Sequence, residues 1–111
     1  MDTLYILWTN ADIVTFDKMV AMYARNAMTH RWWSQVTVII WGSTAKLAAD
    51  SELVALKIRE MLQVGVKISA CKACSDSLGV TEQLEHMGIE VCYWGEGLTQ
   101  ILKSNDRLLT I

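Results

Sequence analysis

The chain alternates short apolar runs with segments of helical periodicity, and this alternation limits its fold more than any other feature. Four runs are almost continuously apolar, as parallel strands buried on both faces of a sheet are. A fifth, shorter run ends the chain. The five predicted strands cover residues 4–8, 36–41, 66–70, 89–94 and 107–111.

Helical segments are predicted between these strands. Apolar residues recur at helical spacing from Phe16 to Ala27, and again over residues 54–62 behind a start signal at Asp50-Ser51. Short helices follow at residues 75–78 and at residues 81–87, the latter capped by Thr81, and a last helix covers residues 98–103. This order predicts an α/β fold: one domain over residues 1–111, with a doubly wound, mostly parallel sheet, right-handed crossovers and helices on both faces.

Charge and cysteine content restrict the class of protein. Ten basic and twelve acidic residues are scattered along 111 positions, so no basic stripe is available for a nucleic acid. No apolar run approaches the roughly 18 residues of a membrane span, and the first residues lack a basic region. We expect a cytoplasmic protein that binds neither nucleic acid nor membrane. Three cysteines without a secretory signal indicate thiols rather than a disulfide framework.

The carboxyl ends of parallel strands are where ligands bind in such folds. We therefore expect the site at the residues that follow the predicted strands. Candidate substrate-binding or partner-binding residues at these ends are Asn10, Trp41, Gly42, Ser43, Trp94 and Gly95. Trp8, Trp41 and Trp94 are expected to surround a cysteine at this edge.

The most specific motif is Cys71-Lys72-Ala73-Cys74, placed where the third strand ends and a helix begins. Unpaired N–H groups and the helix dipole stabilise a thiolate at such a junction, and Lys72 or Lys46 is available to add positive charge. Cys71 is nearer the strand end and is the first candidate for the reactive sulfur. The pair is compatible with disulfide exchange, persulfide carriage or metal binding.

Other chemistries find less support. A thioredoxin-like fold places a cis-proline against its cysteine pair, and this chain has no proline. Zinc ligands would have to come from Cys71, Cys74, His86 and Cys92, whose spacing does not form a second knuckle, so no metal site is assigned. The turns Gly42-Ser43-Thr44 and Gly95-Glu96-Gly97 do not extend into a phosphate-binding motif, so no cofactor is expected.

Several segments carry a resemblance to a known family in their order and spacing. They are Ile40-Trp41-Gly42, Gly65-Val66, Ala70-Cys71-Lys72-Ala73-Cys74, Leu78-Gly79-Val80 and Val91-Cys92-Tyr93-Trp94-Gly95. These segments resemble the DsrE/DsrF-like proteins, which include sulfur-relay subunits of the TusD/DsrE type. Many members have a cysteine eight residues before a glycine, as Cys71 stands before Gly79.

The resemblance implies a flavodoxin-like, three-layer domain with a five-stranded sheet that assembles as a trimer or hexamer. It also implies sulfur donor and acceptor proteins as partners. The leading hypothesis is a possible sulfurtransferase, in which Cys71 accepts sulfane sulfur as a persulfide and Cys74 resolves or modulates it. Two alternatives stay open: a non-catalytic oligomeric binding module for a small anion or partner protein, and a Cys71–Cys74 dithiol redox switch.

Overall fold

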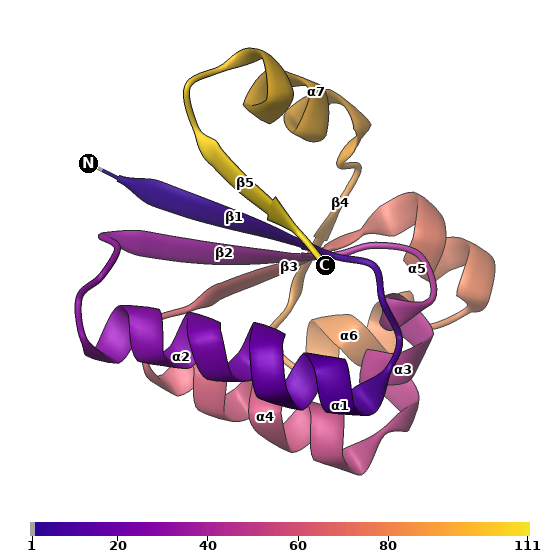
Figure 1. Ribbon diagram of the computed structural model, residues 1–111. Helices are drawn as coiled ribbons and strands as arrows, with labels where there is room; N and C mark the ends of the chain where they lie inside the picture. The colour runs from indigo at the N-terminus through magenta and orange to yellow at the C-terminus, as the bar shows by residue number, and fades with distance from the viewer. Residues whose placement is uncertain (1) are drawn as a thin grey trace.

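The computed structural model describes residues 2–111 and arranges five strands in a parallel sheet (Figure 1). The strands are β1 (Thr3–Trp8), β2 (Gln35–Ile40), β3 (Lys67–Cys71), β4 (Glu90–Cys92) and β5 (Arg107–Thr110). Their order across the sheet is β4-β3-β2-β1-β5, and each neighbouring pair is parallel. The parallel sheet predicted from the apolar runs is confirmed.

The helices follow the predicted pattern with one addition. The first three are successive parts of a single helical segment that widens into a π-helical turn. The helical elements are α1 (Ile13–Thr15), η1 (Phe16–Ala21), α2 (Met22–Thr29), α3 (Thr44–Asp50), α4 (Glu52–Gln63), α5 (Lys72–Leu78), α6 (Thr81–His86) and α7 (Gly95–Lys103). The addition is α3, which the sequence analysis treats as part of a turn.

The strand order explains how the helices divide between the two faces. From β1 to β4 each connection steps to the next strand in the same direction, so right-handed crossovers place α1 to α6 on one face. The last connection returns from one edge of the sheet to the other and carries α7 across the opposite face (Figure 1). The fold is the predicted three-layer α/β domain, with one outer layer much thinner than the other.

The main core lies between the sheet and the larger helical layer. Along β1, Leu4, Ile6 and Trp8 are buried and alternate with less buried residues that face α7. Trp8 is fully buried and stacks on Phe16 of η1 with ring centroids 4.5 Å apart. Trp8 is therefore a core residue, and the expectation that it surrounds a cysteine together with Trp41 and Trp94 is wrong.

The starts of α4 and α6 show whether the predicted N-cap residues form capping hydrogen bonds. Ser51 caps α4 as predicted, accepting a hydrogen bond from the Val54 N–H at 3.2 Å. Thr81 does not cap α6: Val80 precedes that helix, and the Thr81 hydroxyl instead bonds the Ser75 hydroxyl at 2.7 Å and the Asp76 carboxylate. The local capping signal at Thr81 is overridden by these contacts with α5.

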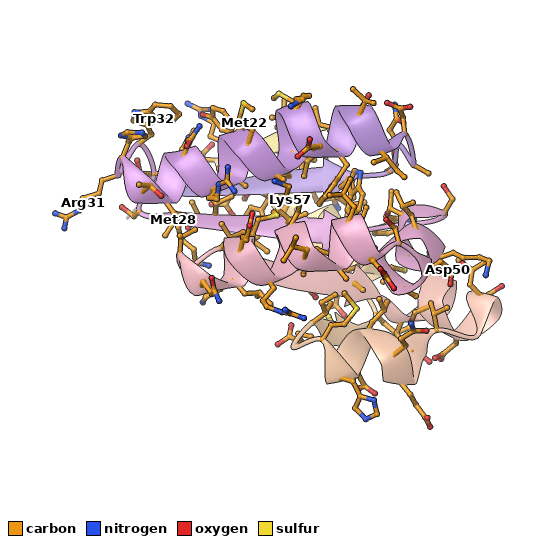
Figure 2. The ribbon with its side chains drawn as sticks, turned by 90° about the horizontal axis from the view of Figure 1, so that it is seen from below. Met22, Met28, Arg31, Trp32, Asp50 and Lys57 are labelled. Carbon is orange, nitrogen blue, oxygen red and sulfur yellow. The ribbon has the colours of Figure 1, made fainter. Side chains whose placement is uncertain are left out.

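No helix within residues 2–111 is both long enough and apolar enough to cross a membrane. The exposed aromatic residue Trp32 lies beyond the end of α2, beside Arg31 (Figure 2). In that view both are at the opposite end of the helical layer from Asp50, which ends α3.

Candidate functional site

The two candidate cysteines meet at the carboxyl end of β3. Cys71 is the last residue of the strand and has the extended backbone of a helix N-cap, while Cys74 lies in the first turn of α5. Cys71 is 4% exposed, whereas Cys74 is half-buried. Both thiols are free. Cys74 is therefore the more accessible of the two cysteines.

The surroundings of Cys74 favour its protonated form. Burial is the largest cause that raises the pKa of this thiol, and a hydrogen bond from the Gly42 backbone acts in the opposite direction. The neighbouring Cys71 thiol raises the pKa of Cys74 further. The thiolate expected at a helix start is consequently not the resting form of Cys74 at neutral pH.

The loop that contains Gly42 is held in place by the buried hydroxyl of Thr44. Thr44 is fully buried, and its Oγ1 lies 2.9 Å from the carbonyl oxygen of Trp8 and 3.1 Å from that of Trp41. The same oxygen accepts the Trp41 N–H at 3.1 Å. Gly42 itself has φ +73°, a conformation that favours glycine. The turn considered for phosphate binding thus joins β1, β2 and α3.

The two lysines predicted to add positive charge are engaged elsewhere. Lys72 pairs with Asp76 at 3.0 Å, and its ammonium lies 5.9 Å from the centre of the Tyr93 ring. Lys46 pairs with Asp50 at 2.9 Å along α3. Each lysine is neutralised by an aspartate one helical turn away.

The remaining predicted site residues divide between two places. Trp41, Gly42 and Ser43 form the turn beside the cysteines, with Ser43 exposed. Asn10 is exposed after β1, where its backbone oxygen accepts the indole N–H of Trp8 at 2.8 Å.

Trp94 turns instead toward the face of the sheet that α7 crosses. It stands at the start of α7, and its indole N–H donates to the hydroxyl of Ser69, in the middle of β3, at 2.8 Å. A Cβ at position 97 would lie 2.9 Å from the Trp94 ring, so Gly97 provides the space in which the ring lies. The motif Gly95-Glu96-Gly97 therefore accommodates an indole.

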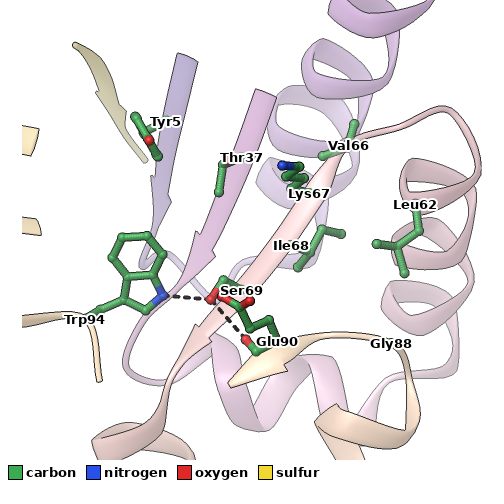
Figure 3. A pocket seen from close by; sticks show the side chains of 10 residues that line it. All are labelled: Tyr5, Thr37, Leu62, Val66, Lys67, Ile68, Ser69, Gly88, Glu90 and Trp94. Carbon is green, nitrogen blue, oxygen red and sulfur yellow. Dashed lines mark hydrogen bonds between the residues drawn. The ribbon is translucent and has the colours of Figure 1, made fainter. Parts of the chain in front are cut away.

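A cavity of about 460 Å³ that was not predicted extends from this face around the outer edge of β3 (Figure 3). Its lining residues are Tyr5, Thr37, Leu62, Val66, Lys67, Ile68, Ser69, Gly88, Glu90 and Trp94. The sequence signal for this face is a set of polar side chains within three mainly apolar strands, at Tyr5, Thr37, Lys67 and Ser69. These residues face the same side of the sheet.

Among residues 2–111, no three His, Cys, Asp or Glu side chains converge to hold a metal ion. Cys92, considered as a ligand, pairs in register with Cys71 on the neighbouring strand. Its sulfur lies 3.7 Å from the Ser69 hydroxyl and 3.9 Å from a carboxylate oxygen of Glu90.

Fold and site together define a parallel α/β domain with a dithiol at the carboxyl end of its third strand. No family model and no curated protein matches the chain. Among solved structures, a conserved protein of unknown function from Bacteroides thetaiotaomicron, BT1422, is similar with a TM-score of 0.97 and 41% identity, covering 99% of this chain and 95% of that one. The chain belongs to the same family as this Bacteroides protein.

A second solved structure shows the fold alone. The ychN protein from E. coli is similar over the whole of both chains, with a TM-score of 0.68 and 16% identity. This likeness shows that the two chains share a fold.

Proposed function

We propose that the protein is a sulfur-transfer protein of the DsrE-like type that carries sulfane sulfur on Cys71. The observation that carries the proposal is the meeting of two free thiols, Cys71 and Cys74, with the Gly42 backbone at the carboxyl edge of the sheet. The DsrE-like fold shared with ychN supports it. The proposal also includes the predicted site residues, sulfur donor and acceptor proteins as partners, a cytoplasmic location, and assembly as a trimer or hexamer.

The loading step needs no external oxidant. The thiolate of Cys71 attacks the terminal sulfur of a donor persulfide, the donor S–S bond breaks, and the donor thiolate leaves with the electron pair and takes a proton from solvent. Cys71 then holds the sulfur as a persulfide. Because Cys71 is 4% exposed, that persulfide is sheltered from water and from small reductants.

Cys74 serves as the resolving thiol in this scheme. Its thiolate attacks the inner sulfur of the Cys71 persulfide, hydrosulfide leaves, and a Cys71–Cys74 disulfide forms. Since burial raises the pKa of Cys74, this release is slow at neutral pH and accelerates as pH rises. A protected persulfide is what a carrier requires until its acceptor docks.

The test is the intact mass of the protein after incubation with a small persulfide donor. The expected result is a gain of one sulfur, about 32 Da, which Cys71→Ala abolishes and Cys74→Ala preserves or prolongs. Cys92→Ala is the matched control, because it removes a third free thiol and should keep the gain. Circular dichroism shows that each variant is folded. Loading that is unchanged in Cys71→Ala would refute the proposal.

A dithiol redox switch is the second candidate, favoured by the same contact between Cys71 and Cys74. With a low-molecular-weight disulfide as oxidant, two thiols become one disulfide and the oxidant is reduced to two thiols. Nonreducing mass spectrometry distinguishes this outcome from loading: the protein loses about 2 Da and gains no sulfur.

A further inference from the structure

The cavity lies around the outer edge of β3, from the α7 face to Leu62 of α4, and results from the shortness of β4. That strand has three residues and pairs only with Ser69, Ala70 and Cys71, so no strand pairs with the outer edge of Lys67 or Ile68. The cavity of about 460 Å³ occupies this notch and extends over the middle of the sheet (Figure 3). Its volume is in the range of pockets that hold small molecules.

One wall of the cavity is fixed in place. The ring of Trp94 is held by the hydrogen bond from its Nε1 to Ser69 Oγ, and Ser69 in turn donates to the Glu90 carbonyl oxygen at 3.0 Å. Ser69 is 4% exposed, and Gly97 leaves room for the indole on the α7 side. This wall connects three elements, so the ring stays in one orientation.

Polar groups in the lining have unused bonding capacity. Thr37 is 6% exposed, and its hydroxyl accepts a long 3.4 Å hydrogen bond from Gln35 Nε2, which leaves its proton to be donated. Lys67 and Glu90 are exposed, and neither takes part in an ion pair between residues 2 and 111. The cavity therefore offers a cation and a hydroxyl donor at one place and a carboxylate at another.

The arrangement of these groups selects the chemistry of a ligand. Lys67 is in register with Thr37 and Glu90 with Ser69, so the two charged side chains stand two positions apart along β3, and half-buried Leu62 supplies an apolar surface at the sheet edge (Figure 3). We propose that the cavity is a binding site for a small zwitterion, an α-amino acid with an apolar side chain. Its carboxylate bonds Lys67 and Thr37, its ammonium bonds Glu90, and its side chain packs on the apolar residues.

This proposal does not depend on sulfur transfer, because none of these contacts involves the Cys71 or Cys74 thiols. The probe is L-leucine, measured by calorimetry and by amide chemical shifts of the full chain. Leucinamide lacks the carboxylate, and N-acetylleucine lacks the ammonium. We expect leucine to bind and each analogue to bind at least about tenfold more weakly, the effect of losing one charged hydrogen bond.

Two substitutions test which residue binds each charged end of the ligand. Lys67→Gln should weaken leucine and leave leucinamide unchanged, and Glu90→Gln should weaken leucine and leave N-acetylleucine unchanged. The matched controls are Lys103→Gln and Glu52→Gln, exposed residues outside the lining, which should not alter binding.

Three results would overturn the proposal. The first is the absence of shifts at millimolar leucine in the native protein. The second is equal binding of leucine and both analogues. The third is a combination of two observations: no amino acid binds, and light scattering gives Trp94→Ala a lower oligomer mass than the native protein. That combination would show that a second copy of the chain covers this face.

Discussion

The indole N–H of Trp94 donates to the hydroxyl of Ser69 across 2.8 Å, and this bond ties the start of α7 to the middle of β3. It is a contact between residues 25 positions apart on opposite sides of a crossover. Through it α7 is oriented over the sheet, and the indole becomes a wall of the cavity rather than part of the thiol site.

Gly97→Ala should destabilise the protein although alanine is the better helix former. A Cβ at this position would lie 2.9 Å and 3.0 Å from two Trp94 ring atoms, and the ring is held by Ser69. Overpacking of this kind should lower the free energy of unfolding by about 1–3 kcal/mol. Urea unfolding measures this difference. Gly95→Ala is the matched control, with nothing within 4 Å of its added Cβ, and should be neutral or stabilising. Equal effects at both glycines would contradict the prediction.

Thr44→Val should lower the free energy of unfolding by about 1–3 kcal/mol. The substitution keeps the shape but removes the buried hydroxyl that bonds Trp41 and the Trp8 carbonyl oxygen. Thr99→Val removes an exposed hydroxyl bonded to the Gly95 carbonyl oxygen at 2.8 Å, and should change stability by no more than about 0.5 kcal/mol. Thermal unfolding of the two variants, followed side by side, measures the difference.

Asp76 should contribute to stability in a pH-dependent way. Hydrogen bonds from Thr81 and then from Lys72 hold the pKa of this carboxyl below its usual range. Its contribution is therefore fully present above the unfolded value of about 3.9 and is lost as pH falls through the lower folded pKa. Asp76→Asn should be less stable than the native protein at pH 7, and the two should converge below about pH 4.

Urea titrations at several pH values test this convergence. The control is Asp106→Asn, an exposed aspartate without an ion pair between residues 2 and 111. A stability difference for Asp76→Asn that does not depend on pH would show that the carboxylate charge is not what stabilises this corner.

Alkylation should distinguish the two thiols of the pair. Iodoacetamide is expected to modify half-buried Cys74 faster than Cys71, which is 4% exposed. Because the pKa of Cys74 is raised, its modification rate should keep increasing with pH beyond the usual thiol range near 8.5. Peptide mass spectrometry at timed intervals gives both rates. Faster labelling of Cys71 in the folded protein would contradict the burial on which the carrier scheme depends.

Much of the fold follows from local patterns. Apolar runs identified all five strands, and the Ser51 signal identified the start of α4. The helix α3 was missed because its only long apolar residue is Leu47, so it shows no amphipathic period. Thr81 was misassigned because its hydroxyl has better partners in α5 than the backbone of its own helix.

The candidate site was predicted only in part. The pair Cys71 and Cys74 lies at the strand end as expected, since positions only three residues apart at a strand-to-helix junction are set locally. The environment of the pair was predictable only in part. The pairs Lys46–Asp50 and Lys72–Asp76 are i,i+4 pairs within one helix, which helical spacing can indicate, whereas the exposure of a thiol depends on side-chain packing between distant segments.

The sequence by itself determined the α/β class, the order of strands along the chain and the position of the dithiol, because periodicity and capping act over a few residues. The tertiary structure alone decided the order of strands across the sheet, the burial of Trp8 and the direction of Trp94. It also created the cavity, which exists because β4 begins only at Glu90, opposite Ser69, and leaves the edge of β3 open at Lys67 and Ile68. These features arise from contacts between residues far apart in the chain, whose free energies no local pattern records.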